Sequence, residues 1–194
     1  MKGDLLCPNC GSLARNRRLW LLLESRFLAP ALHVLDFSPS RCLYRNLKKK
    51  QGISYQSTDL SGDFISDYQY DITNIKTVDN QFDLIICYHI LEHVPNDLQA
   101  MKELHRVLKP GGTCLIQTPF KGTENIYEDP AIVSEQERTL HFGQKDHVRI
   151  YSVQGLNKRL TQVGFTVNVQ TFGPAIPNTN GFKEMETILF CHKK

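Results

Sequence analysis

The sequence of 194 residues predicts an α/β domain in three layers, with helices on both faces of a mostly parallel sheet. The first indication is that segments with strand-like and helix-like patterns alternate along most of the chain. The second is the strand expected at Asp83–Cys87, whose apolar residues are consecutive rather than alternating. Such a run is typical of a strand covered on both faces. The crossover to the next strand should be right-handed.

The first half of the domain is expected to contain two helices and two strands. Leu13, Trp20 and Phe27 lie on one side of the first helix, which is therefore amphipathic. Short apolar segments separated by a helical one follow it. In order, the expected elements are a helix over residues 12–28, a strand over 33–37, a helix over 40–50 and a strand over 53–58.

The second half continues the alternation. Asn96 or Asp97 can cap a helix whose apolar residues recur every three or four positions. The Lys109–Gly112 segment should end that helix, because proline cannot continue it and glycine permits positive φ. Gly164 should end the last helix in the same way. In order, the expected elements are a strand over 83–87, a helix up to 108, a strand over 113–117, a helix over 152–163, and strands over 165–171 and 186–192.

Acidic residues close the first two strands. In open parallel sheets the ligand crevice lies beyond the carboxyl ends of the strands, where the strand order reverses. Asp36 and the loop 37–40 should therefore face a ligand. Asp59 ends the second strand, where a carboxylate can accept hydrogen bonds from both hydroxyls of a ribose. The alternative for each acid is that it caps a helix or a turn.

Several motifs together resemble class I S-adenosylmethionine-dependent methyltransferases, in particular the methyltransferase type 11 group. The resemblance covers roughly residues 33 to 192, and its best matches are VLDFSPS, STDL, YDIT, FDLIICYHILEHV and LKPGG. It implies a Rossmann-like three-layer sandwich with a mostly parallel seven-stranded sheet and a final antiparallel strand. It also divides the chain into residues 1–30, with a cysteine turn and an amphipathic helix, and a methyltransferase domain over 31–194.

The resemblance implies S-adenosylmethionine as the cofactor. In the family, the acid that closes the second strand binds the adenosine ribose, and this position is Asp59. An acid and an apolar residue before the fourth strand contact adenine, and the residues that close that strand lie beside the methionine moiety. The cofactor-binding residues expected on this basis are Asp36, Phe37, Ser38, Pro39, Asp59, Leu60, Asp71, Ile72, Tyr88 and His89.

The first loop departs from the family pattern. Phe37-Ser38-Pro39-Ser40 replaces the usual glycine-rich turn, so other backbone amides must approach the cofactor. We interpret this as an alternative loop, and a non-catalytic binder of the cofactor is the competing interpretation. A dehydrogenase would share the architecture, but the missing G-x-G-x-x-G fingerprint argues against one.

A long polar and aromatic connection over residues 120–151 interrupts the alternation and is expected to form a lid over the substrate. His141 or His147 in it could remove a proton from an acceptor. Arg149 and Tyr151 are expected to contact the substrate, and Tyr88 to position the reacting groups. A hydrogen bond to the backbone is the alternative for each lid histidine, and His93 and His105 are more typical of structural positions.

The Cys7-Pro8-Asn9-Cys10-Gly11 turn resembles half of a zinc knuckle, since zinc sites need about four ligands and a second closely spaced pair does not occur. We predict no metal for the chemistry of methyl transfer. The other cysteines lie in apolar stretches, where buried thiols are common. Arg15, Arg17 and Arg18 near the turn either bind a phosphate or carboxylate or form a solvated face.

Three functions remain open on the sequence. The favoured one is a cytoplasmic methyltransferase of a small molecule, since no segment has the roughly 20 apolar residues of a membrane span and no secretory signal is evident. An RNA-modifying methyltransferase is suggested by the cysteine turn and its arginines but disfavoured by a net charge of only +3. A module that binds the cofactor without turnover is the third.

Overall fold

A sheet of six strands forms the centre of the computed structural model, which describes residues 6–122, 124–174 and 176–194. The order is β2-β1-β3-β4-β8-β7, in which β8 runs antiparallel between β4 and β7 and the pairs from β2 to β4 are parallel. The predicted, mostly parallel sheet with a final antiparallel strand is confirmed. The strands are β1 (His33–Phe37), β2 (Ser54–Thr58), β3 (Phe82–Tyr88), β4 (Leu108–Gln117), β7 (Thr166–Phe172) and β8 (Glu186–His192).

The expectation of a seventh strand is wrong for the described residues. Beyond β2 the chain makes a single parallel bridge, between Thr58 and Tyr68. Two residues further on, the amide of Tyr70 donates to the hydroxyl of Thr58 (2.7 Å) rather than to a backbone carbonyl. A side chain therefore takes the place of a ladder hydrogen bond, and the edge strand does not extend.

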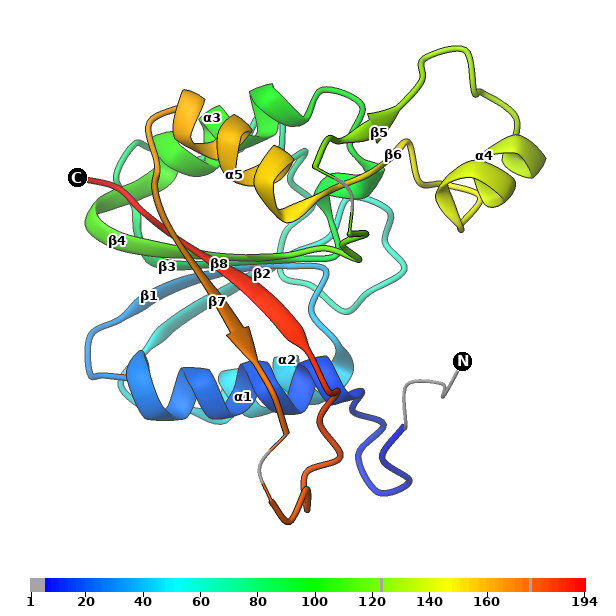
Figure 1. The fold of residues 1–194 in the computed structure, drawn as a ribbon. Coiled ribbons are helices and arrows are strands. Elements are labelled where there is room, and N and C mark those ends of the chain that lie inside the picture. Colours follow the sequence, from blue (N-terminus) through cyan, green and yellow to red (C-terminus); the bar gives the residue numbers. More distant parts are fainter. Residues whose placement is uncertain (1–5, 123, 175) are drawn as a thin grey trace.

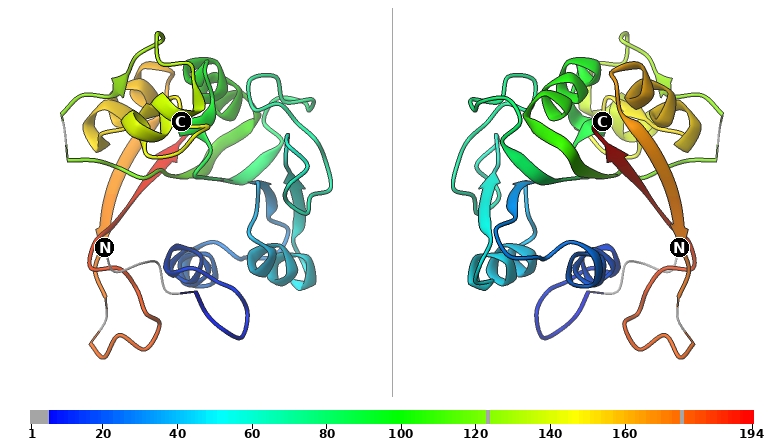
Figure 2. Two further views of the ribbon diagram at one scale, coloured as in Figure 1. Left: turned by 90° about the vertical axis from the view of Figure 1, so that its right-hand side faces the viewer. Right: turned by 90° about the vertical axis from the view of Figure 1, so that its left-hand side faces the viewer.

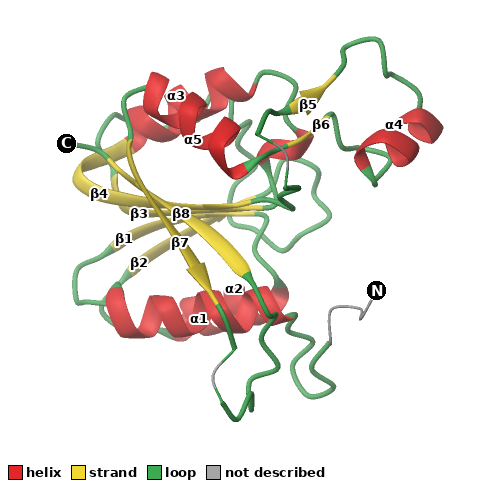
Figure 3. Cartoon of the chain, viewed as in Figure 1, coloured by secondary structure: helices red, strands yellow, loops and turns green. Residues whose placement is uncertain are grey.

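Helices cover both faces of the sheet, as Figures 1 and 3 show: α1 and α2 lie on one face, and α3 and α5 on the other. Figure 2 shows the twist of the sheet between these layers. The helices are α1 (Ala14–Arg26), α2 (Arg41–Lys49), the 3-10 turn η1 (Leu91–His93), α3 (Asp97–Val107), α4 (Glu135–Phe142) and α5 (Val153–Gln162). The predicted cap at Asn96 is confirmed, since its side chain accepts from the amide of Gln99. Ser152, at the predicted start of α5, caps that helix by accepting from the amide of Gly155.

The consecutive apolar residues of β3 contribute to two hydrophobic cores, one on each face of the sheet. Leu84 and Ile86 pack with α1 and α2, whereas Ile85 and Cys87 pack with α3 and α5. Side chains alternate across a strand, so a strand between two helical layers must be apolar at every position. Helix α1 contributes Leu19, Leu22 and Leu23 to the first of these cores, so it belongs to the same sandwich.

The Lys109–Gly112 segment lies inside β4 instead of forming a separate loop. Helix α3 ends at Val107, and β4 begins at Leu108. Its pairing with β3 is irregular between Phe82 and Leu84, where the extra residues are accommodated. Gly111 has a φ of +78°, which explains why the turn out of the helix uses glycine.

The connection between β4 and α5 contains its own elements. The short strands β5 (Tyr127–Glu128) and β6 (Arg149–Ile150) pair with each other, and α4 lies between them. In Figure 1 this segment stands beyond one end of the central sheet.

The sequence analysis expected no secretory signal in residues 1–6, of which residues 1–5 lie outside the described part. In the part that the structure describes, no helix combines the length and apolarity needed to cross a membrane.

Candidate active site

A cleft of about 1190 Å³ lies at the carboxyl ends of β1 and β3. Its walls include side chains from α1, the loop after β2, the η1 turn and the lid segment. Every residue predicted to bind the cofactor lines it, and so does His147, whereas His141, Arg149 and Tyr151 do not. The topology thus gathers the motifs at the one sheet edge where the ligand crevice was expected.

In the Ser-Pro loop, Ser38 adopts the left-handed backbone conformation that a glycine usually provides. Ser38 has a φ of +47°, a conformation that favours glycine. Its amide donates to the carbonyl of Thr58 (2.7 Å), and its hydroxyl donates to Asp59 (2.6 Å). These two bonds to the end of β2 hold a backbone shape that a glycine would adopt without help.

Asp59 is the centre of the loop that closes the second strand. One carboxylate oxygen accepts from Ser38, and the other accepts from the hydroxyl of Ser61 (2.9 Å) and the amides of Gly62 (2.7 Å) and Phe64 (3.3 Å). Burial raises the pKa of Asp59, but these hydrogen bonds outweigh burial and lower it overall. The side chain is therefore an ionised acceptor at the cleft wall.

Asp36 is a buried acid at the end of β1. Its carboxylate accepts a hydrogen bond from the hydroxyl of Tyr55 (3.0 Å). Burial raises the pKa of Asp36 to about 7, and the bond from Tyr55 offsets only part of this effect. Folding therefore favours the protonated carboxyl, in contrast to Asp59.

Asp36→Asn should stabilise the protein at pH 8 and not at pH 4. The ordinary pKa is 3.8 and the folded value is about 7, so the contribution of Asp36 to stability is fully present below pH 4 and is lost as the pH rises through 7. The gain from the amide at pH 8 should be on the order of 2 to 4 kcal/mol, since one pKa unit corresponds to about 1.4 kcal/mol.

Urea unfolding of both proteins at pH 4 and pH 8 measures this difference. Asp79→Asn is the matched control, because its side chain is 67% exposed and its change should not depend on pH in this way. An equal gain for Asp36→Asn at both pH values would contradict the argument.

The remaining predicted cofactor residues contribute both polar and apolar groups to the cleft. Asp71 is exposed and accepts from the amide and hydroxyl of Thr73 (both 2.8 Å), and Ile72 beside it is buried. The Tyr88 hydroxyl is buried without a hydrogen-bond partner among the described residues, and burial raises its pKa well above the ordinary value. His89 has a φ of +56°, an unusual backbone conformation of the kind found at functional sites.

Glu92 and His93 are cleft residues that the sequence interpretation missed. Both belong to the η1 turn, and both line the cleft. Glu92 is only 1% exposed, and His93 lies 3.0 Å from a carboxylate oxygen of Asp146. The signal in the sequence was a pair of polar residues, Glu92 and His93, between the apolar Leu91 and Val94, which an ordinary core turn does not require.

His141 and His147, the two histidines of the lid segment, differ in burial and in their contacts. His147 is buried, its Nδ1 lies 3.3 Å from the carbonyl of Phe142, and burial lowers its pKa. His141 is exposed and shares a hydrogen bond of 2.7 Å with the hydroxyl of Tyr127. Of these two, only His147 can meet a ligand in the cleft.

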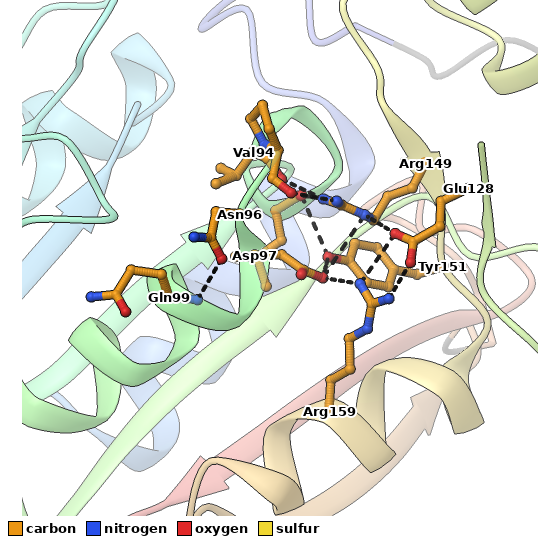
Figure 4. A network of polar contacts seen from close by, with 10 residues as sticks. Val94, Asn96, Asp97, Gln99, Glu128, Arg149, Tyr151 and Arg159 are labelled. Carbon is orange, nitrogen blue, oxygen red and sulfur yellow. Dashed lines mark hydrogen bonds and ion pairs between the residues drawn. The ribbon is translucent and has the colours of Figure 1, made fainter. Parts of the chain in front are cut away.

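Arg149 and Tyr151 are buried in a polar network that ties the lid to the start of α3 (Figure 4). Arg149 donates to Glu128 (2.8 Å) and to the carbonyls of Leu91 (3.1 Å), Val94 and Pro95 (2.8 Å). The Tyr151 hydroxyl donates to Asp97, which also accepts from Arg159. These side chains thus hold the lid segment in place beside the cleft without lining it.

The cysteine turn near the N-terminus is formed, but its metal-binding role is unsupported. The amide of Gly11 donates to the carbonyl of Cys7 (2.9 Å), and Cys10 Sγ donates to Ser12 (3.2 Å). Backbone hydrogen bonds, first that of Cys10, lower the pKa of Cys7. Among the described residues, the group of three or more potential ligands that the fold assembles lies elsewhere and contains no cysteine.

Two of the three neighbouring arginines hold the loop between β7 and β8. Arg17 donates to the carbonyl of Gly181 (3.1 Å), and Arg18 donates to that of Gly173 and stacks on Phe182, 3.8 Å from its ring centre. The solvated-face expectation is wrong for Arg18, whose side chain is 11% exposed. Arg15 lines the cleft.

A family model described as a methyltransferase domain matches residues 15–170 of this chain. The chain belongs to that methyltransferase family. This methyltransferase domain is also 31% identical, over 88 residues, to the ubiquinone biosynthesis O-methyltransferase of Psychrobacter arcticus. That match covers 44% of this chain and 34% of the relative, so the chain corresponds to only part of the longer enzyme.

Solved structures share the fold of the methyltransferase domain. The YcgJ protein of Bacillus subtilis matches with a TM-score of 0.63 at 13% identity, over 92% of this chain and 99% of that one. Phosphoethanolamine N-methyltransferase 2 of Haemonchus contortus, crystallised with S-adenosyl-L-methionine, matches with a TM-score of 0.64 at 14% identity, over 92% of this chain and 52% of that one. At such identities the likeness concerns the fold alone.

Proposed function

We propose that this protein transfers the methyl group of S-adenosylmethionine to an oxygen, nitrogen or carbon nucleophile of a small molecule in the cytoplasm. The observation that carries the proposal is the single cleft lined by all the predicted cofactor residues. Its volume of about 1190 Å³ is larger than that of most small-molecule pockets, which range over roughly 300 to 1,000 Å³. It therefore has room for the cofactor and an acceptor together.

In this proposal, the residues at the strand ends hold the cofactor in order along the cleft. Asp59 is an ionised acceptor, and its Oδ1, which accepts from Ser38, has a second lone pair that suits a hydroxyl of the ribose. Asp71 and the buried Ile72 would contact the adenine, and Tyr88 and His89 the methionine moiety. The Ser38 loop would bring its backbone to the cofactor in place of a glycine-rich turn.

The transfer itself requires alignment more than acid–base chemistry. The nucleophile attacks the methyl carbon in line with the departing sulfur, and S-adenosylhomocysteine leaves. The protein must hold the two reacting atoms within about 3 to 3.5 Å and exclude water. The lid segment over residues 120–151 would close the acceptor end, where His147 is the candidate for accepting a proton.

The acceptor class follows from the kind of relative that the chain resembles. An O-methyltransferase of ubiquinone biosynthesis acts on an oxygen, so a phenolic hydroxyl is the first acceptor class to test. The RNA-modifying alternative loses its main support, because Arg17 and Arg18 are engaged with the loop between β7 and β8. An RNA would need such cations at its phosphates.

Calorimetry with S-adenosylmethionine, S-adenosylhomocysteine and NAD tests the cofactor. We expect micromolar binding of the first two and none of NAD. Transfer of a labelled methyl group to catechol, a simple phenolic probe, then tests the activity. Absence of S-adenosylmethionine binding would refute the proposal, and tight binding without transfer to any phenol or amine would favour the non-catalytic module.

A further inference from the structure

Three potential metal ligands meet at one wall of the cleft. Glu92 and His93 come from the η1 turn, and His147 comes from the lid segment before β6. One ligand atom from each lies within 4.8 Å of the others. The rings of His93 and His147 meet edge to face, with their centres 4.6 Å apart. The three side chains therefore point into one small volume, although His147 is far from the other two in sequence.

Glu92 is a buried acid at this wall of the cleft. The residue is 1% exposed, and neither carboxylate oxygen accepts a hydrogen bond from the described residues. His89 Nδ1 lies 3.2 Å from one of these oxygens. An unsatisfied buried carboxylate costs several kcal/mol on general grounds. A cation at this point would offset that cost.

Both histidines are oriented as metal-binding histidines are. His93 Nδ1 lies 3.0 Å from the carboxylate of Asp146, and His147 Nδ1 lies 3.3 Å from the carbonyl of Phe142. In the neutral tautomer that donates from Nδ1 to such an oxygen, Nε2 is the nitrogen with a free lone pair for a metal. Metal-ligating histidines usually donate their other N–H to a carboxylate or a carbonyl in the same manner.

The backbone fixes the two contributing segments to each other. The amide of Val148, next to His147, donates to the carbonyl of Glu92 (2.9 Å). The Arg149 contacts to the carbonyls of Leu91 and Val94 hold the same two segments together. The ligand set is thus part of the ordered connection between lid and sheet and does not depend on a chance approach of surface side chains.

We propose that Glu92, His93 and His147 bind one divalent transition-metal ion, for which zinc is the best-fitting representative. Two imidazoles and a carboxylate suit zinc, whereas magnesium and calcium prefer oxygen ligands. Two ligands of one tetrahedral zinc lie about 3.4 Å apart, so modest side-chain rotations would close the site. Three protein ligands leave a coordination position for a small molecule.

The metal site itself does not depend on the proposed function. Its consequence does, because the ion would lie at the acceptor end of the methyltransferase cleft only if that function holds. His147 would then act as a ligand and not as a free base. The sequence-based prediction of no metal considered methyl transfer alone, which needs none, and did not see the burial of Glu92.

The test measures zinc binding by calorimetry on chelator-treated protein in which Cys7 and Cys10 are both replaced by serine, so that the cysteine turn cannot contribute. We expect one zinc ion per chain. Glu92→Gln and His147→Ala should each weaken binding by at least about 100-fold, because even partners outside the ligand sphere contribute roughly 10- to 100-fold. His141→Ala, which removes a lid histidine outside the cluster, should leave zinc affinity unchanged.

Cobalt(II) absorption gives a second readout, since visible bands of a tetrahedral site should appear in the parent protein and disappear in Glu92→Gln. Circular dichroism verifies that each variant is folded. No zinc binding by the folded parent, or a zinc affinity in Glu92→Gln and His147→Ala equal to that of the parent, would overturn the site. S-adenosylmethionine binding by chelator-treated protein separates the two proposals: if it persists without zinc binding, only the metal site fails, and if zinc binds without it, only the methyltransferase proposal fails.

Discussion

Arg149→Met is expected to lower the free energy of unfolding by about 3 to 5 kcal/mol, because removal of one partner from a buried ionic network leaves the others uncompensated. Arg149 is 5% exposed, and its guanidinium donates to Glu128 and to three backbone carbonyls of the segment before α3. Methionine fills similar space but donates no hydrogen bond. Buried carbonyls would lose their donors and Glu128 one of its two cations.

Urea unfolding followed by circular dichroism measures this loss. Lys145→Met is the matched control from the same lid segment, because Lys145 is 67% exposed and its ion pair with Glu135 is long, at 3.7 Å. The control should change stability by less than about 0.5 kcal/mol. A similar small change for Arg149→Met would mean that the network of Figure 4 does not hold the lid.

Asp59→Ala is expected to weaken S-adenosylmethionine binding by about 10- to 100-fold. A hydrogen bond from a ribose hydroxyl to an ionised carboxylate is worth about 1.5 to 3 kcal/mol, and 1.4 kcal/mol corresponds to a tenfold change in affinity. Among the described residues, Oδ1 of Asp59 accepts one hydrogen bond, from Ser38, so its second lone pair can accept from a ribose hydroxyl, whereas Oδ2 already accepts from Ser61, Gly62 and Phe64. Calorimetry with the cofactor measures the change.

Ser61→Ala separates the cofactor contact from the loop contact. It removes one bond from the loop to Asp59 but keeps the carboxylate, so it should cost less than about tenfold in affinity. An equally large loss in Ser61→Ala would assign the effect of Asp59 to loop order. Unchanged affinity in Asp59→Ala would exclude the ribose contact.

The strands, the helices and the position of the cleft could be predicted because they follow from local patterns. The unbroken apolar run in β3 requires cover on both faces, and capping residues such as Asn96 and Ser152 begin their helices where they stand in the sequence. Parallel strands end at one edge, so acids at strand ends, such as Asp36 and Asp59, had to meet there. The prediction of a seventh strand was wrong because the hydroxyl of Thr58 accepts the amide hydrogen bond of Tyr70 that would otherwise help to extend the sheet.

The sequence by itself thus determined the layers of this methyltransferase domain and the edge at which its motifs gather. Only the tertiary structure decided which lid side chains reach the cleft. Glu92 and His147 are neighbours although they are 55 positions apart in the sequence, and Arg149 reaches backbone carbonyls of residues at similar separations. Local spacing fixes the direction of a side chain on a helix or strand, whereas in an irregular segment that direction depends on contacts with residues far away in the chain. Burial of Glu92 and His147, exposure of His141 and the structural position of Arg149 are consequences of those contacts.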